Sequence, residues 1–170
     1  RRKPKQFLDI TGKGPMVVET CNRLKPLARE EEIILVLGRE HLGHVKELFR
    51  GSKVHMLAEP IGRNTAPCVG LGAIYAGHLG CEEPVAFLPA DHFIGDEASF
   101  LEALGAAAKL AESGGIVTLG IVPNRPETGY GYIRRDQGYV DQGLTAYRVS
   151  EFVEKPDLEK ARHYLTSGDY

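Results

Sequence analysis

The chain has 170 residues, of which 42% are hydrophobic and 26% are charged, which is an ordinary composition for a soluble globular protein. Its formal net charge of -2 gives no general attraction to nucleic acid or to an anionic membrane, although local lysines can still bind phosphates. No apolar run approaches the roughly 20 residues that a membrane helix needs, and no apolar signal core follows the basic residues 1–5. Nucleic acid and membranes are therefore not expected as partners.

The three cysteines, Cys21, Cys68 and Cys81, are odd in number and lack the spacing of a metal or disulfide motif. We expect each to be a reduced, buried, small apolar residue, which suits the cytoplasm. Both ends look cut, because the sequence opens in Pro-Lys-Gln-Phe-Leu with no strand before it and stops directly after a helical pattern. We therefore expect a fragment of a longer chain.

Hydrophobic spacing predicts alternating helices and strands over the first two thirds of the chain. In chain order we expect a helix with Val17, Cys21, Leu24 and Ala28 on one face, a buried strand at 32–37, a helix at 40–49, a strand at 54–57, a helix at 66–79, a buried strand at 85–88, a helix at 97–113 and a strand at 116–122. Asn64 or Thr65 is the expected cap of the 66–79 helix, and Asp96 that of the 97–113 helix. This alternation predicts a parallel sheet with helices on both faces.

The last third of the chain has a different pattern. Residues 130–135 and 145–154 alternate like half-exposed antiparallel strands, and a polar turn with Gly138 and Gly143 joins them. A final helix is expected to start near Asp157. The predicted fold class is therefore α/β, a three-layer sandwich around a mixed, mainly parallel sheet, in a single domain that spans residues 1–170.

Ligands of open α/β sheets bind beyond the carboxyl ends of the strands, where Asp91 and Lys155 are expected. A carboxylate at Asp91 is able to hold Mg²⁺, which binds through one or two carboxylates together with substrate phosphates; alternatively, Asp91 caps the next segment. Lys155 is biased toward an extended backbone by the proline after it and suits a phosphate as a point charge. Its alternative is a surface lysine in a salt bridge.

Glu59 follows another predicted strand. A carboxylate can accept two parallel hydrogen bonds, and the Watson–Crick edge of guanine offers adjacent N1–H and N2–H donors, so Glu59 is able to select guanine over adenine. The predicted helix start near Ala66 offers free backbone N–H groups to an anion. The alternative is that Arg63 and Asn64 only shape the turn.

Other patterns are less specific. Gly129 and Gly131 allow a backbone to approach a ligand closely, or they are turn or bulge glycines. His41 and His44 lie three residues apart on a predicted helix, where two solvated histidines are favoured over a metal pair. The sequence contains neither G-x-x-x-x-G-K-[ST] nor G-x-G-x-x-G, so the usual NTPase and dinucleotide interpretations lack support.

Five motifs occur in a fixed order along the chain. They are Pro-Lys-Gln-Phe-Leu at 4–8, Glu-Pro-Ile-Gly-Arg-Asn-Thr-Ala-Pro at 59–67, Leu-Pro-Ala-Asp-His at 88–92, Glu-Thr-Gly-Tyr-Gly-Tyr-Ile at 127–133 and Phe-Val-Glu-Lys-Pro at 152–156. Each is weak alone, but in this order they resemble the bacterial mannose-1-phosphate guanylyltransferases of the sugar-1-phosphate nucleotidyltransferase family. The resemblance spans the whole chain.

The resemblance implies the Rossmann-like fold of nucleotide-diphospho-sugar transferases and the reaction of GTP with mannose 1-phosphate to give GDP-mannose and pyrophosphate, with Mg²⁺ as cofactor. The sugar phosphate oxygen would attack the α-phosphorus in line, without a covalent enzyme intermediate. Catalysis would then rest on positioning and charge neutralisation. GTP and mannose 1-phosphate are the implied partners, and a homo-oligomer stays possible.

The resemblance also implies roles for individual residues. Lys5 would contact phosphates, Asp91 would hold Mg²⁺, and Lys155 would bind the sugar phosphate, which makes these three the candidate catalytic residues. The residues implied for the guanine-side loop are Glu59, Arg63, Asn64 and Thr65. The residues implied for sugar binding are Gly129 through its backbone, Glu154 and Lys155.

Two competing functions remain open. The same chemistry on dTTP or ATP is disfavoured by Glu59, because a glutamine suits thymine better than a carboxylate does. A non-catalytic regulatory domain that binds a nucleotide sugar is disfavoured because Asp91 and Lys155 are both present.

The family's Gly-rich loop with its catalytic arginine, and its second metal carboxylate, have no counterpart within residues 1–170. We therefore expect these residues alone not to turn over, and to expose apolar sheet surface that promotes aggregation or the recruitment of a partner. An assay of GDP-mannose formation by the purified chain checks the first expectation. Measurable synthesis would contradict it.

Overall fold

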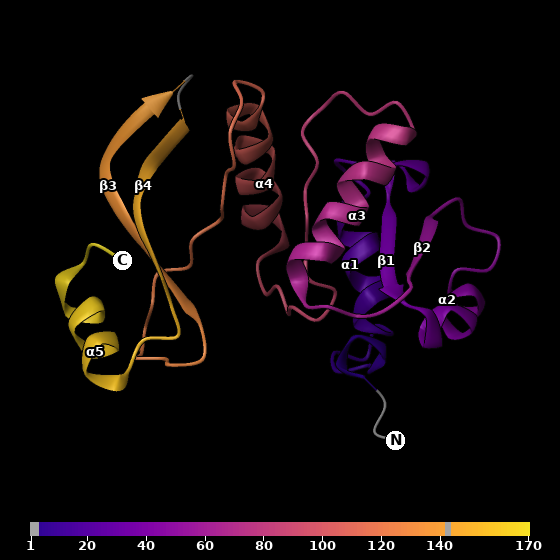
Figure 1. The fold of residues 1–170 in the computed structure, drawn as a ribbon, viewed down its shortest axis with the longest axis horizontal. Coiled ribbons are helices and arrows are strands. Elements are labelled where there is room, and N and C mark those ends of the chain that lie inside the picture. Colours follow the sequence, from indigo (N-terminus) through magenta and orange to yellow (C-terminus); the bar gives the residue numbers. More distant parts are fainter. Residues whose placement is uncertain (1–3, 142–143) are drawn as a thin grey trace. The chain divides into compact units, whose positions relative to one another are not determined.

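The computed structural model describes residues 4–141 and 144–170. Within it the chain forms two compact units, the first ending at Ser113 and the second comprising Gly114–Tyr170. Figure 1 shows the elements of both units, and each unit is described by itself. The single domain expected for residues 1–170 stays a prediction.

The first unit is built around a parallel pair of strands, β1 (Ile34–Gly38) and β2 (His55–Glu59). Its other elements are the 3₁₀ turns η1 (Lys5–Phe7), η2 (Glu30–Glu32) and η3 (Arg39–His41), and the helices α1 (Met16–Leu24), α2 (Leu42–Leu48), α3 (Thr65–His78) and α4 (Glu97–Ala111). The strands pair in register from Ile34 opposite His55 to Gly38 opposite Glu59. This parallel pairing confirms the strand–helix–strand unit expected from the hydrophobic pattern.

Helices cover both faces of this strand pair. Leu35 and Leu37 pack against a buried cluster that α1 and α2 share. The side chain between them, Val36, points to the opposite face, where a β-carbon placed on Gly72 of α3 would lie 3.4 Å from Val36 Cγ2. Because alternate residues of a strand face opposite sides, these contacts confirm the expected three-layer arrangement within this unit.

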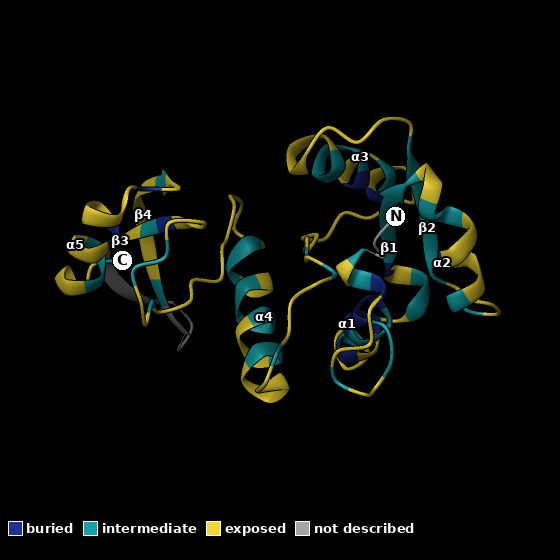
Figure 2. Ribbon diagram, turned by 90° about the horizontal axis from the view of Figure 1, so that it is seen from below, coloured by how far each residue is buried: buried dark blue, intermediate teal, exposed yellow. Residues whose placement is uncertain are grey.

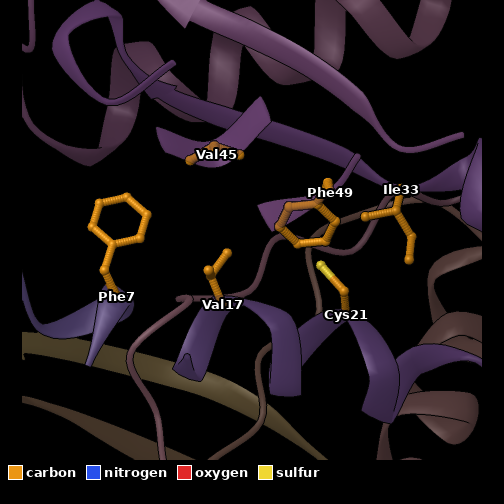
Figure 3. Packing of buried hydrophobic residues seen from close by; sticks show 6 residues of the cluster. All are labelled: Phe7, Val17, Cys21, Ile33, Val45 and Phe49. Atoms are coloured by element: carbon orange, nitrogen blue, oxygen red, sulfur yellow. The ribbon is translucent and has the colours of Figure 1, made fainter. Parts of the chain in front are cut away.

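The core of the first unit is an apolar cluster. Its buried members are Phe7, Val17, Cys21, Ile33, Val45 and Phe49. Figure 3 shows the side chains of Val17 and Cys21 rising from α1 toward those of Val45 and Phe49, and Figure 2 shows buried residues concentrated on α1. The expected helical face is thus confirmed for Val17 and Cys21, whereas Ala28 lies beyond Leu24, the last residue of α1, and packs against the cluster from outside the helix.

Two predicted strands are not formed. Residues 85–88 and 116–122 pair with no other strand in the described part of the chain. Without a neighbour in a ladder these segments leave apolar side chains exposed, with Ile116 at 96% and Ile121 at 89%. The expectation of exposed apolar surface is confirmed, whereas the aggregation that it implies stays a prediction.

β1 is only half-buried along its whole length, although a buried strand was expected there. Its one pairing partner among the described residues is β2.

The second unit contains an antiparallel hairpin, β3 (Gly131–Asp141) and β4 (Leu144–Glu154), followed by α5 (Leu158–Ser167). Both strands and the last helix confirm the prediction for this third of the chain. The expected turn residue Gly138 instead lies inside β3 opposite Tyr147, because the strand runs beyond the predicted end. Gly143 lies outside the described residues.

Two helix starts follow local capping rules. Asp96 Oδ1 accepts a hydrogen bond from the Ser99 N–H at 3.0 Å, and Asp157 Oδ1 accepts one from the Lys160 N–H at 2.8 Å. These bonds hold the pKa of both carboxyls below the usual range. The expected cap by Asn64 is wrong as a side-chain interaction, because Asn64 makes no such bond, and Thr65 is already the first residue of α3.

All three cysteines are free, as expected, but their burial differs. Cys21 is buried, and burial raises the pKa of its thiol to about 11. Cys68 is half-buried, and Cys81 is exposed because it lies in the loop that follows α3. The expectation of three buried thiols is therefore confirmed for Cys21, only partly met by Cys68 and wrong for Cys81. Among the helices of the described residues, none has the length and apolarity to cross a membrane.

Arg23 on α1 is a nearly buried charge whose side chain is 5% exposed. Its Nε lies 3.8 Å from Glu97 Oε1 of α4 and has no hydrogen-bond partner within residues 4–141 and 144–170. We expect Glu97→Gln to lower the free energy of unfolding by about 1–3 kcal/mol, because it leaves this cation without a counter-charge. Urea unfolding measures the change.

Glu102→Gln is the control, because Glu102 is an exposed glutamate on the same helix. Equal effects of the two substitutions would show that the Arg23–Glu97 pair does not stabilise the unit.

Candidate functional site

The carboxyl ends of β1 and β2 lie side by side, because Gly38 pairs with Glu59. Glu59 is half-buried, and its carboxylate accepts no hydrogen bond from any residue that the structure describes. Burial and, second, the charge of Glu59 raise the pKa of the Cys68 thiol in the first turn of α3. The predicted guanine-side carboxylate therefore lies beside the start of α3 with its oxygens free for a ligand.

The loop between β2 and α3 contains a strained residue. Asn64 has φ 66° and ψ -165°, a combination that is nearly restricted to glycine and costs about 1–3 kcal/mol in other residues. In the described parts of the chain, the non-glycine residues with positive φ are Asn64 and Lys155, and both belong to predicted site motifs. The extended backbone expected for Lys155 is therefore wrong, because its φ of 46° lies in the left-handed region. Such strain gathers at ligand-binding sites, which favours the site interpretation of these two loops.

Arg63, Asn64 and Thr65 are all exposed. Arg63 forms no ion pair within the described ranges, and Asn64 leaves the first backbone N–H groups of α3 without a side-chain cap. The first turn of a helix has N–H groups with no partner inside the helix, and these attract anions. The loop thus presents both a cation and backbone donors.

Asp91 is exposed in the turn after residues 85–88. Its carboxylate neither accepts a hydrogen bond nor forms an ion pair with any described residue, so it does not cap the next segment; that role belongs to Asp96. No group of three or more His, Cys, Asp or Glu side chains able to hold a metal lies in the part of the chain that the structure describes. A single free carboxylate fits Mg²⁺, which takes its remaining ligands from water and substrate phosphates.

The buried cluster reaches the backbone next to two candidate catalytic residues. Lys5 is exposed at the start of η1, and Phe7 at the end of the same turn is a cluster member. Ala90, directly before Asp91, also packs against the cluster. One core therefore supports the positions of both Lys5 and Asp91.

The second unit brings the predicted sugar-side residues together. Gly131 pairs with Glu154, and the Lys155 N–H donates to the Tyr130 carbonyl at 3.2 Å. The loop that contains Gly129 is held to β3, because the Glu127 N–H donates to the Tyr132 hydroxyl at 2.9 Å. Gly129, Glu154 and Lys155 thus lie on adjoining ends of one hairpin.

Gly131 permits a close approach at this hairpin end. A β-carbon there would lie 2.5 Å from Phe152 Cζ and 3.0 Å from Glu154 Oε2, so a larger residue would displace the candidate sugar-binding carboxylate. Both atoms are at the ends of exposed side chains, with Phe152 at 61% and Glu154 at 59%, so these side chains can move, and the alternatives that the sequence left for Gly131 stay open.

Lys155 forms the salt bridge that its alternative interpretation predicts. Its Nζ lies 3.4 Å from Glu154 Oε1, and the two side chains are 64% and 59% exposed. Exposed pairs of this kind contribute only about 0–1 kcal/mol. A phosphate is able to replace Glu154 as the partner of Lys155 at little cost, so the salt bridge does not exclude the phosphate role.

The nucleotide-side residues lie in the first unit and the sugar-side residues in the second, and the structure defines each group separately. Sequence reasoning missed Tyr132 and Phe7, which hold these loops. The expectation that His41 and His44 are solvated is confirmed for His44, which is exposed, and holds in part for His41, which is half-buried; the contact of both rings with Phe7 was not foreseen. Aromatic residues inside the two motifs were the available signal.

We expect Asn64→Gly to raise the free energy of unfolding by about 1 kcal/mol. Glycine removes strain of about 1–3 kcal/mol and adds unfolded-state entropy worth about 0.5–1 kcal/mol. Asn64→Ala is the control, because alanine keeps the strain and should be neutral or destabilising. Thermal unfolding compares the variants, and an equal response to glycine and alanine would show that Asn64 is unstrained.

Comparison with known proteins gives a consistent assignment. A model described as nucleotidyl transferase matches residues 1–170. Mannose-1-phosphate guanylyltransferases of Klebsiella pneumoniae and Escherichia coli are each 44% identical over 170 residues, covering 98% of this chain and 36% of each relative. The chain thus spans about a third of the length of the curated relatives that it matches.

Solved structures agree with this assignment. One is described as mannose-1-phosphate geranyltransferase from Thermus thermophilus. It superposes with a TM-score of 0.86 at 38% identity, and the match covers 97% of this chain and 47% of the Thermus chain. Mannose-6-phosphate isomerase from Helicobacter pylori gives a TM-score of 0.77 at 30% identity, over 98% and 61%. These similarities confirm the expected α/β nucleotidyltransferase fold. Because the family model covers every residue of the sequence, the chain belongs to the nucleotidyl transferase family.

Proposed function

We propose that this chain is part of an enzyme that makes GDP-mannose and pyrophosphate from GTP and mannose 1-phosphate. The observation that carries the proposal is the 44% identity to mannose-1-phosphate guanylyltransferases over 98% of the chain. The free carboxylates of Glu59 and Asp91 and the exposed Lys5 support it, because an in-line transfer between phosphates needs base recognition, a metal ligand and positive charge.

On the nucleotide side, Glu59 accepts hydrogen bonds from N1–H and N2–H of guanine through its two free oxygens. Arg63 and the N–H groups at the start of α3 bind anionic groups of the nucleotide. Lys5 adds a point charge for the phosphates. Asp91 is the residue that would hold Mg²⁺, which supplies neutralisation of the charge that develops on the phosphates.

On the sugar side, the hairpin residues bind mannose 1-phosphate. The backbone at Gly129 meets the sugar, and Lys155 binds its phosphate in place of Glu154. The carboxylate released from that salt bridge then accepts a hydrogen bond from a sugar hydroxyl. Lys155 neutralises the attacking phosphate while its loop fixes the direction of attack, so that catalysis rests on positioning.

The proposal extends to the setting of the reaction. Mg²⁺ is the proposed cofactor, and the free thiols are compatible with the reducing cytoplasm.

The test is isothermal titration of the full-length gene product with GTP, GDP-mannose, ATP and dTTP, with and without Mg²⁺. We expect selective binding of the guanine nucleotides. Glu59→Gln should reduce the preference for GTP over ATP by about tenfold or more, because a buried donor of guanine loses its charged partner. Asp91→Asn should remove the Mg²⁺ dependence.

Glu83→Gln is the control, because Glu83 is an exposed glutamate in a loop of the same unit. Selective binding of dTTP or ATP would favour another nucleotidyltransferase. Tight binding of the nucleotide sugar without turnover would favour a regulatory domain, and binding of none of these ligands would refute the proposal.

A further inference from the structure

Phe7 lies against two histidine rings. Its ring centroid is 5.3 Å from that of His41 and 5.0 Å from that of His44, with interplanar angles of 64° and 83°. These are edge-to-face geometries, which aromatic rings favour. Phe7 is 3% exposed, His41 is half-buried and His44 is exposed, so two partly or fully exposed imidazoles lie against a buried phenyl ring.

The Phe7 ring is coupled to Lys5 through a short, hydrogen-bonded turn. The Phe7 N–H donates to the Pro4 carbonyl at 3.1 Å, and the Leu8 N–H donates to the Lys5 carbonyl at 2.9 Å. Phe7 also packs into the buried cluster. The Lys5 side chain is exposed and forms no ion pair with the residues described, so its direction depends on the backbone that Phe7 anchors.

The histidines couple the same turn to the edge of the strands where Glu59 lies. His41 ends η3, which begins directly after Gly38, the last residue of β1. Gly38 pairs with Glu59. The contacts of Phe7 with His41 and His44 therefore join the turn of Lys5 to the carboxyl edge of the strand pair.

We propose that His41 and His44 are positioning residues for Lys5, acting through Phe7. They hold the Lys5 turn against the carboxyl edge of β1, where the Lys5 ammonium meets the phosphates of a nucleoside triphosphate. This inference rests on the proposed function of Lys5. The effect is assigned to the ring contacts, because both histidine rings lie edge-to-face with the buried Phe7 ring.

A double-mutant cycle on the full-length gene product tests the inference. Isothermal titration gives the affinity for GTP of the parent, of His41→Ala/His44→Ala, of Lys5→Met and of the triple variant. We expect the alanine pair to weaken GTP binding roughly tenfold, because the loss of two edge-to-face contacts corresponds to about a tenfold change in an equilibrium constant. In the Lys5→Met background the same alanine pair should have no further effect, since coupled residues are not additive.

Matched variants separate positioning from general stability. His41→Phe/His44→Phe keeps the rings and should keep GTP affinity within about twofold, as the ring contact is retained. His78→Ala removes an exposed histidine near another aromatic ring, that of Tyr75 at 6.5 Å, and should leave GTP affinity unchanged. If the alanine pair fails to fold, the exposed His44→Ala alone serves in the cycle.

Each outcome decides one question. If Lys5→Met leaves GTP affinity unchanged, the proposed role of Lys5 is wrong and the inference is wrong with it. If Lys5→Met weakens binding and the alanine pair does not, or if the two effects add, the inference alone is overturned. Faster hydrogen exchange at the Phe7 and Leu8 amides in His41→Ala/His44→Ala would support the inference that the two histidines hold the Lys5 turn. Unchanged exchange would refute it.

Discussion

The apolar cluster around Phe7 and Val45 is the constraint on which the first unit depends. It joins the N-terminal turn, two helices and the start of β1, which are distant in sequence. Full burial of one such side chain stabilises a fold by about 1.5–3 kcal/mol relative to exposure, whereas an exposed ion pair contributes at most about 1 kcal/mol. Packing, rather than polar contacts, therefore sets the positions of these elements.

The same packing connects stability with the proposed chemistry. Phe7 and Ala90 both belong to or contact the cluster, and they lie next to Lys5 and Asp91 in sequence. The charged side chains themselves remain exposed. A rigid apolar cluster that holds the backbone next to exposed charged side chains is suited to phosphoryl chemistry, in which positioning and charge neutralisation provide most of the catalysis.

The polar groups of the candidate site are poorly satisfied by the protein. Glu59 and Asp91 accept no hydrogen bond from the described residues, Asn64 and Lys155 have unfavourable backbone angles, and Lys155 has only an exposed salt bridge. The backbone angles are the informative part of this set, because a residue held in a sparsely populated conformation costs about 1–3 kcal/mol and such strain gathers at ligand-binding sites. Their occurrence in the predicted motifs supports the proposed roles of these residues.

The sequence by itself determined the local features of this protein. Apolar spacing predicted α3, α4, α5 and the strands β1 to β4. Asp96 was recognisable as a cap residue and Asp157 as the approximate start of a helix, because helix periodicity and capping involve residues within four positions of one another. The order of motifs also identified the family and placed Glu59 at a strand end.

Only the tertiary structure decided the features that depend on distant neighbours. Residues 85–88 and 116–122 have strand-like sequences but no partner to form a ladder with among the residues described, since pairing is a property of two segments and not of one. The packing of His41 on Phe7 likewise depends on two segments that are distant in sequence. Local preference predicts an element, but only contacts between segments remote in sequence determine what it packs against.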